Sequence, residues 1–481
     1  MMLDTALRPN PAEAGPASVL ERLTRRLPPA ALLAGEASDA RYRETLSAHP
    51  AAEPAFVMRP GDANEAALCL AVCEEARQPV AIQGGRTGFQ GGERVRQGEA
   101  VLSLERMTRL SAIDEVGATI DAEAGVPLQR VQEAADEAGL LFGVDIGARG
   151  SATIGGNVAS NAGGIRVLRY GMFRAQVLGL EAVLADGTIL TSMRGLPKDN
   201  AGYDLNQIFI GSEGTIGVVT RARLKLHPKP AAELAAFCGV PSLEAAIALL
   251  SHVRAELGPL VSAFEVIYAE ALEGALVCAR QDRPVERSPF YVLAELHALQ
   301  PEADGERFAA TLMAAHEAGL VGDIVLAQSD REFRALWALR DACSTYVSSL
   351  DRCIGCDISI PARHLAAFTE EAERMVRALD RRALLPVFGH LGDGNLHYIV
   401  QTDRPDAVVD AVHECVARFG GSIAAEHGVG FDKKRYLSIS RSGAEIAAMR
   451  RLKRAFDPHN ILNPGRVFDL DAGSGQQGAS L

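Results

Sequence analysis

The stretch GARGSATIGGNVASNAGG, residues 147–164, decides which fold this chain is expected to have. Glycine recurs through it at close spacing, and the side chains between the glycines include Ser151, Asn157, Ser160 and Asn161. Glycine lets backbone N–H groups approach a ligand without obstruction by a Cβ atom. Hydroxyl and amide side chains add donors and acceptors for a pyrophosphate or the edge of a polar heterocycle. The stretch therefore favours loops that hold a polar ligand.

Two further glycine loops lie on either side of this stretch: PVAIQGGRTGFQGGE, residues 79–93, and FIGSEGTIGVVT, residues 209–220. The first lacks both the Gly-Lys-Ser/Thr of a P-loop and the G-x-G-x-x-G of a dinucleotide turn. Taken singly, tight turns at the corners of a barrel explain such loops as well as a ligand does. Three of them within one domain favour a large, extended cofactor that carries phosphate.

The chain divides into two domains at a Pro-containing boundary, LKLHPKPAAE, residues 224–233. Before it, AFVMRP, DANEAALCLAVCEEAR and PVAIQGG predict a strand, a helix and a strand. After it, helices such as SLEAAIALLSHVRAEL alternate with strands such as FYVLAELHA, which is typical of an α+β domain. We expect an N-terminal helical segment at 1–50, a first domain at 51–230, a second domain at 231–425, a return to the first domain at 426–470 and a disordered tail at 471–481.

Composition excludes some classes of function. The net charge of −12 argues against a nucleic-acid partner, because phosphate binding needs a basic face. Eight scattered cysteines predict reduced thiols rather than a disulfide framework. The chain has no apolar run long enough to span a bilayer, and its first residues lack the apolar core of a signal peptide. We expect a cytoplasmic protein, and peripheral contact with the inner face of the membrane stays open.

The strongest ligand-type side chains lie in GHLGDGNLH, residues 389–397, and AAEHGVG, residues 424–430. If Asp393 and Gly394 form a two-residue hairpin loop, His390 lies directly opposite His397 on one face of the sheet. Two such imidazoles suit a divalent metal, and Glu426 can supply a carboxylate as third ligand. On an extended segment, His427 would point away from Glu426, and it suits a general base for an alcohol proton.

The glycine loops, together with KDNAGYDLNQ before the third loop and NPGRV near the end of the chain, resemble the flavin-binding signature of the vanillyl-alcohol-oxidase-type flavoproteins. Within that superfamily the chain is most similar to the FAD-linked D-2-hydroxyacid dehydrogenases, which include D-lactate, D-2-hydroxyglutarate and glycolate dehydrogenases. The resemblance implies an α+β fold, with a two-subdomain FAD-binding domain and an α+β substrate domain built on an antiparallel sheet.

The resemblance also implies which residues hold the cofactor. Arg86 and Thr87 stand where some relatives tether the flavin through His or Cys, so FAD is expected to bind non-covalently. The expected FAD-binding residues are Gln83, Gly84, Gly85, Arg86, Thr87, Gly88, Gln90, Gly147, Ser151, Gly155, Gly156, Asn157, Asn161, Gly164, Gly211, Glu213, Gly214, Ile216 and Asn463.

For the second domain, the resemblance makes His390, His397 and Glu426 the metal ligands and His427 the catalytic base. Zn²⁺ is the first expectation for the metal, with Mn²⁺ or Fe²⁺ as alternatives. Substrate contacts are expected from His427, Asn395, Arg340 and Ser344. The last two lie four residues apart in a predicted helix, LWALRDACSTYV at 336–347, and so share a face. An arginine matches a carboxylate well, although helix position alone would make Arg340 a solvated surface residue.

The implied activity is oxidation of a D-2-hydroxy acid to the 2-keto acid by hydride transfer to flavin. Relatives that act on hydroxyglutarate carry a lysine shortly before D-x-S-x-P, where this chain has Gly355 or Cys356. A second substrate carboxylate would lose that positive partner, which favours D-lactate over D-2-hydroxyglutarate, and these two acids are the expected substrates. The alternatives are a glycolate-oxidase-type subunit, a flavoprotein oxidase of another alcohol, or a flavin-binding subunit without turnover. An electron-transfer flavoprotein or a quinone is expected to reoxidise the flavin, and a homodimer stays open.

Overall fold

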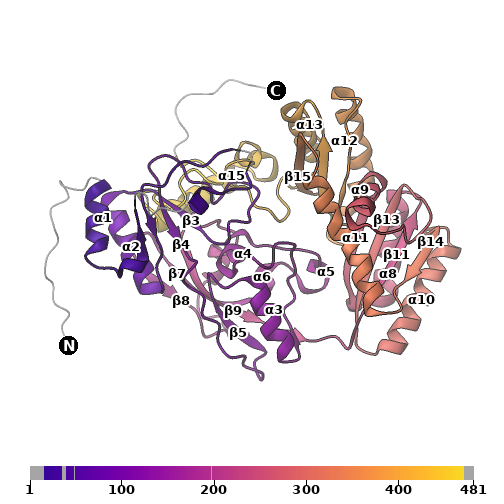
Figure 1. Ribbon diagram of the computed structural model, residues 1–481, viewed down its shortest axis with the longest axis horizontal. Coiled ribbons are helices and arrows are strands. Elements are labelled where there is room, and N and C mark those ends of the chain that lie inside the picture. The colour runs from indigo at the N-terminus through magenta and orange to yellow at the C-terminus, as the bar shows by residue number, and fades with distance from the viewer. Residues whose placement is uncertain (1–15, 35–39, 48, 197, 471–481) are drawn as a thin grey trace.

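The structure is a computed structural model that describes residues 16–34, 40–47, 49–196 and 198–470. The tail that we expected to be disordered, 471–481, lies outside the described residues, as does the start of the predicted N-terminal segment. In Figure 1 the first domain, indigo to magenta, and the second domain, pink to orange, lie side by side. The yellow C-terminal segment with α15 (Gly443–Phe456) lies against the first domain.

The first domain contains two four-stranded sheets. One has the order β1-β2-β4-β3 and contains three parallel strands, and the other has the order β5-β9-β7-β8 and is antiparallel throughout. The predicted strand-helix-strand unit is present, but β4 lies between its two strands. The strands are β1 (Leu32–Leu33), β2 (Val57–Met58), β3 (Val80–Gln83), β4 (Ala100–Ser103), β5 (Thr119–Glu123), β7 (Val177–Val183), β8 (Ile189–Thr191) and β9 (Val218–Lys225), with a small pair β6 (Leu140–Leu141) and β10 (His227–Pro228).

Helices of the first domain cover these sheets and carry part of the glycine loops. Its helices are α1 (Pro16–Thr24), α2 (Ala63–Ala76), α3 (Leu128–Glu137), α4 (Ile154–Ser160), α5 (Val167–Tyr170), α6 (Phe173–Gln176) and α7 (Asn206–Phe209). Asp62 caps α2, because its side chain accepts the Glu65 N–H. The hydrophobic core around the first sheet also takes in Ile461 and Leu462, so the end of the described chain packs beside β3.

The second domain is built on a seven-stranded antiparallel sheet of order β14-β11-β13-β12-β16-β17-β15. Its strands are β11 (Ala232–Val240), β12 (Val261–Tyr268), β13 (Phe290–Ala298), β14 (Asp323–Leu326), β15 (Cys353–Ser359), β16 (Phe388–His390) and β17 (Asn395–Gln401). Its helices are α8 (Leu243–Leu257), α9 (Ala269–Ala279), α10 (Pro301–Glu317), α11 (Asp330–Ser348), α12 (Leu365–Leu379) and α13 (Pro405–Arg418), and α14 (Leu437–Ser440) follows. Short 3₁₀ helices lie at Pro29–Ala31, Ala40–Arg43, Gly258–Leu260, Ala362–His364 and Lys434–Tyr436.

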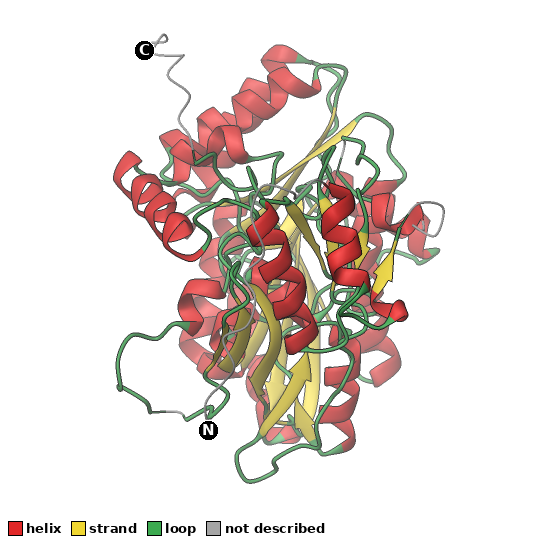
Figure 2. Ribbon diagram, turned by 90° about the vertical axis from the view of Figure 1, so that its left-hand side faces the viewer, coloured by secondary structure: helices red, strands yellow, loops and turns green. Residues whose placement is uncertain are grey.

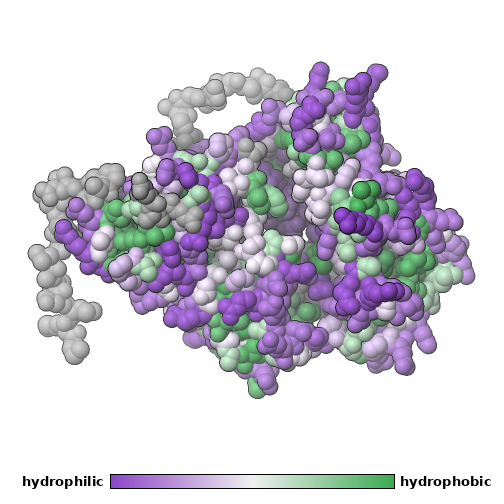
Figure 3. Space-filling view, in the orientation of Figure 1, coloured by the Kyte–Doolittle hydropathy of each residue, from purple (hydrophilic) through white to green (hydrophobic). Residues whose placement is uncertain are grey.

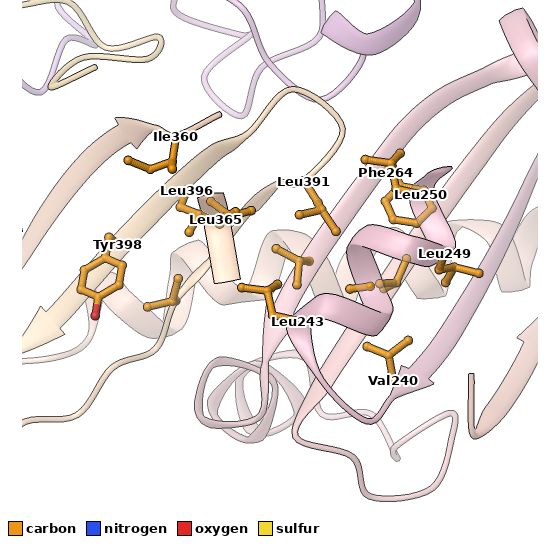
Figure 4. Packing of buried hydrophobic residues seen from close by; sticks show 14 of the residues in the cluster. Val240, Leu243, Leu249, Leu250, Phe264, Ile360, Leu365, Leu391, Leu396 and Tyr398 are labelled. Carbon is orange, nitrogen blue, oxygen red and sulfur yellow. The ribbon is translucent and has the colours of Figure 1, made fainter. Parts of the chain in front are cut away.

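Both faces of the seven-stranded sheet are covered by helices. In Figure 2, where the first domain faces the viewer, helices surround the strands of the protein. One face packs against α8, α10, α12 and α13, and the other packs against α9 and α11. Leu396 and Tyr398 point to the first of these faces, where Figure 4 shows them among other buried apolar side chains. Because side chains alternate along a strand, His397 points to the opposite face, which carries α11. The fold class is confirmed: an α+β protein with an antiparallel sheet in its second domain.

On the face seen in Figure 3 hydrophilic residues predominate, and hydrophobic residues occupy separate small areas. Within the described residues, no helix is both long enough and apolar enough to cross a membrane.

Candidate active site

The three glycine loops of the first domain meet one another. A Cβ atom on Gly85 of the first loop would lie 2.1 Å from the Ser151 carbonyl oxygen of the second, so only glycine fits this approach. The third loop joins the second through the Gly211 N–H, which donates to the Val158 carbonyl at 3.0 Å. Asn463 joins the third loop, since its side-chain amide donates to the Glu213 carbonyl at 2.7 Å.

Buried polar atoms at these loops fit a polar cofactor. The side-chain oxygens of Gln83 and Thr153 and the Asn157 side-chain nitrogen are buried without a hydrogen-bond partner in the structure. Such groups are costly to bury unless a ligand satisfies them. Arg86, Asn161, Glu213 and Asn463 have positive φ angles, and such backbone strain in non-glycine residues tends to concentrate at ligand sites. The predicted FAD-binding residues thus lie on adjoining loops, and these residues suit a polar cofactor such as FAD.

The histidine hairpin is confirmed, but the predicted register is wrong. His390 pairs with Asn395 and His397 pairs with Phe388, so the loop has four residues instead of two. A two-residue type I′ turn needs positive φ at both positions, and of Asp393 and Gly394 only Gly394 has it. His390 and His397 are therefore diagonal neighbours on the same face of the sheet, and their ring centroids lie 5.2 Å apart.

Three imidazoles converge on one carboxylate oxygen. The Nε2 atoms of His390, His397 and His427 lie 3.6, 3.7 and 3.4 Å from Oε1 of Glu426. The expectation that His427 points away from Glu426 is wrong, because residues 424–430 form an irregular loop instead of a strand. The second Glu426 oxygen accepts the N–H of Gly164 at 2.8 Å. The cluster thus touches the glycine loops of the first domain.

Two buried carboxylates behind the histidines were missed by the sequence analysis. Oε1 of Glu265 lies 2.7 Å from Nδ1 of His390. Asp357 lies 3.8 Å from the Nδ1 atoms of both His397 and His427. Each is the one acidic residue of a mostly apolar strand, and that was the one local signal of their role. Carboxylates in this position orient imidazoles for metal binding.

Of the predicted substrate-binding residues, some are buried beside the histidines and one is exposed to solvent. Arg340 of α11 is buried, and its Nε donates to Glu265 at 2.8 Å. Ser344, one turn further along, is exposed. Asn395 is buried, and its side-chain amide donates to Asp357 and to the Ile358 carbonyl, both at 2.9 Å. Arg340 is therefore linked through Glu265 to His390, one of the three histidines around Glu426 that we call the histidine cluster (His390, His397 and His427). Asn395 holds Asp357.

The pKa values of the three histidines are shifted in different directions by burial and by the neighbouring carboxylates. Burial lowers the pKa of His397 to about 3. Burial acts in the same direction on His390, but Glu265 and Glu426 outweigh it and raise the pKa of His390 to about 10. Burial also opposes protonation of His427, yet Asp357 and Glu426 raise its pKa above the usual value. A divalent cation among these groups would oppose protonation of every imidazole.

The donor set fits a divalent metal. Asp357, His397, Glu426 and His427 each offer one ligand atom, and these four atoms lie within 4.8 Å of one another. Asp357 is already engaged by the backbone N–H groups of Ala425, Glu426 and His427 at 2.9–3.1 Å, whereas Nε2 of His390 faces Glu426. Imidazole nitrogens with a carboxylate oxygen are the ligands of zinc-type sites. The residues predicted as ligands are thus close together in the structure.

Comparison with known proteins agrees with this organisation. The family model described as FAD binding domain matches residues 54–192, and the model for the C-terminal domain of FAD linked oxidases matches residues 229–467. The mitochondrial D-2-hydroxyglutarate dehydrogenase of Bos taurus is 38% identical over 421 residues, covering 86% of this chain and 77% of that protein. The D-2-hydroxyglutarate dehydrogenase of Xanthomonas citri pv. viticola is 38% identical over 428 residues, covering 86% and 89%.

Solved structures share the architecture at lower identity. Substrate-bound p-cresol methylhydroxylase superposes with a TM-score of 0.75 at 16% identity, covering 94% of this chain and 97% of that one. At this identity the likeness concerns the fold alone. It supports the vanillyl-alcohol-oxidase-type arrangement expected from the glycine loops.

Proposed function

The chain belongs to the FAD-linked D-2-hydroxyacid dehydrogenases, and on that premise we propose that it oxidises its substrate at a divalent metal held by His390, His397 and Glu426. The observation that carries this proposal is the convergence of three imidazole Nε2 atoms on one Glu426 oxygen. Glu426 also accepts an N–H from the glycine loop at Gly164, which supports a reaction centre at the junction of the two domains.

Each side chain has a distinct part in the proposed reaction. The guanidinium of Arg340 binds the substrate carboxylate and, through Glu265, fixes the ring of His390. Nε2 of His427 accepts the proton of the 2-hydroxyl group as the keto acid forms. When bound, the flavin supplies a hydride acceptor and the metal supplies Lewis-acid polarisation of the hydroxyl oxygen. The metal is proposed to be Zn²⁺, with Mn²⁺ or Fe²⁺ as alternatives.

Two substrates are supported by different observations. The names of the relatives favour D-2-hydroxyglutarate. D-lactate is favoured by Gly355 and Cys356 of β15, because neither offers a positive charge where hydroxyglutarate dehydrogenases are expected to carry a lysine. A second substrate carboxylate would lose that partner, whereas the single carboxylate of D-lactate needs only Arg340.

The remaining assignments extend the same proposal. An electron-transfer flavoprotein or a quinone is proposed to reoxidise the flavin. A cytoplasmic location, with peripheral contact to the inner face of the membrane as the alternative, is supported by eight cysteines that are all free thiols in the structure.

Anaerobic flavin reduction tests the proposed reaction. The flavin absorbance is followed while D- and L-lactate, D- and L-2-hydroxyglutarate and glycolate are added separately. Bleaching by a D-enantiomer, with none by its L-enantiomer, is the expected result. Bleaching by D-lactate alone supports the inference that β15 offers no partner for a second substrate carboxylate, and bleaching by D-2-hydroxyglutarate alone contradicts it. Reduction by none of the five acids would contradict the proposed function.

A further inference from the structure

The loop at residues 424–430 carries both Glu426 and His427, and it lies between the two domains (Figure 1). It has no regular secondary structure, so its backbone N–H groups need acceptors from elsewhere. Five of these N–H groups donate to two carboxylates, one from each domain.

Asp357 holds the first half of the loop from the second domain. One of its oxygens, Oδ2, accepts the N–H groups of Ala425, Glu426 and His427 at 3.1, 3.0 and 2.9 Å. Its other oxygen accepts the side-chain amide of Asn395 at 2.9 Å, which connects it to the histidine hairpin. Because Asp357 is buried in β15, this anchorage is fixed to the sheet that carries His397.

Glu213 holds the second half of the loop from the first domain. Its two oxygens accept the N–H groups of Val429 at 2.7 Å and Gly430 at 2.8 Å. The loop approaches this carboxylate so closely that a Cβ atom on Gly428 would lie 2.9 Å from it. Glu213 lies in the third glycine loop, where we expected it to contact FAD, but both of its carboxylate oxygens bind the backbone of residues 424–430.

We propose that Asp357 and Glu213 are a pair of positioning residues that hold the loop at residues 424–430 between the two domains. They thereby fix Glu426 and His427 relative to the histidine hairpin on one side and the glycine loops on the other. Neither carboxylate is assigned a contact with substrate. This inference rests on the proposed function for its effect on metal binding, but the backbone contacts themselves can be tested without turnover.

The test uses Glu213→Gln and Asp357→Asn, each in the full-length protein. An amide keeps one acceptor but presents an NH₂ donor to a neighbouring N–H, so part of the anchorage is lost. Hydrogen–deuterium exchange at single-residue resolution should become about tenfold faster at Val429 and Gly430 in Glu213→Gln. The same acceleration is expected at Ala425, Glu426 and His427 in Asp357→Asn.

Metal titration supplies the second measurement. The dissociation constant for Zn²⁺ should rise about 10- to 100-fold in both variants, while the flavin content stays at the wild-type level. Asp323→Asn is the matched control, because the two oxygens of Asp323 likewise accept one backbone N–H each, from Glu286 and Ile324, on a distant edge strand. It should leave exchange at residues 424–430 and Zn²⁺ binding unchanged.

Two results would overturn the inference. One is unchanged exchange at both sets of amides in the folded variants. The other is loss of flavin in Glu213→Gln with normal Zn²⁺ binding, which would make Glu213 a cofactor contact. If the wild type binds no Zn²⁺ at all, the metal part of the proposed function fails, and the exchange measurement still decides whether the two carboxylates hold the loop.

Discussion

Arg340 is buried and makes two contacts beside the histidines. One of its five N–H donors is committed to Glu265, which in turn contacts His390. Its guanidinium also lies over the ring of Phe388, 5.1 Å from the centroid. These two contacts leave other guanidinium N–H donors for the proposed contact with the substrate carboxylate.

Arg340→Ala should raise the substrate concentration needed for half-maximal flavin reduction. Loss of a charge-assisted contact of about 1.5–3 kcal/mol corresponds to roughly a 10- to 150-fold change. The measurement is anaerobic reduction at saturating Zn²⁺ over a range of substrate concentrations. Arg334→Ala, an exposed position on the same helix, is the control and should behave as wild type. An unchanged concentration dependence in Arg340→Ala would remove the residue from substrate binding.

His427→Ala should separate proton transfer from metal binding. The proposed ligands His390, His397 and Glu426 remain in this variant, so the metal content measured by elemental analysis should stay near the wild-type value. Loss of a general base typically lowers the rate about 10²- to 10⁴-fold, and stopped-flow flavin reduction should slow accordingly. His397→Ala is the comparison and should lose metal and activity together. Loss of metal in His427→Ala would instead make His427 a ligand.

At the scale of elements, the hairpin of β16 and β17 holds His390 in place through the apolar residues around it. Leu391 begins the four-residue loop, and its side chain is buried in the second domain's core with Leu396 (Figure 4). The loop therefore contributes to the core as well as to the site.

Leu391→Ala should destabilise the protein by about 2–5 kcal/mol, because it removes a buried side chain and leaves a cavity. The measurement is denaturant unfolding followed by a probe of the second domain. Leu384→Ala is the control, since Leu384 is 40% exposed, and its effect should stay within about 0.5 kcal/mol. Equal stability of the two variants would show that the loop does not depend on the burial of Leu391.

The hairpin also illustrates what the sequence could and could not predict. His390 and His397 share a face in both the predicted and the observed register, because lengthening the loop from two residues to four shifts the pairing by two residues, which is the side-chain period of a strand. The loop length was not predictable from Asp393-Gly394 alone, since it depends on whether Asp393 adopts a positive φ. The partners of Glu265 and Asp357 could not be predicted for a different reason. Their N–H groups and imidazole rings come from distant parts of the chain, and a local pattern does not show which distant groups contact a buried carboxylate.

At the scale of the molecule, a buried ionic cluster joins the two domains. Arg166, just after the second glycine loop, lies 3.0 Å from Glu295 of β13, and Tyr170 lies 2.7 Å from Nδ1 of His297 on the same strand. Burial alone would raise the pKa of Glu295, but Arg166 and His297 hold it well below its ordinary value. A local sequence pattern could not predict these contacts between the domains, because the residues are far apart in the chain. The same holds for the pairing of β12 with β16 in the second domain.

Glu295→Gln should lower the free energy of unfolding at pH 7 by about 1.5–3 kcal/mol, because Arg166 loses its charged contact with the fully buried Glu295, while Glu233 at 3.1 Å and Asp145 at 3.8 Å remain. A carboxylate with a depressed pKa stabilises the fold above its unfolded-state pKa, and that contribution is lost as the pH falls. The difference between wild type and variant should therefore be constant above about pH 5 and shrink below about pH 4.3. Unfolding at pH 7 and pH 3.5 measures it, with the exposed Glu306→Gln as control. A difference that does not depend on pH would contradict this account.

Metal removal followed by anaerobic flavin reduction tests most directly whether the histidine cluster is the reaction centre. The wild-type protein is treated with a chelator, its metal and FAD contents are measured, and reduction by the preferred D-2-hydroxy acid is followed before and after Zn²⁺ or Mn²⁺ is returned. The account predicts that FAD stays bound, that reduction slows by two orders of magnitude or more, and that about one equivalent of metal per chain restores it. The account would be contradicted if protein that keeps its FAD but has lost its metal were reduced at the wild-type rate.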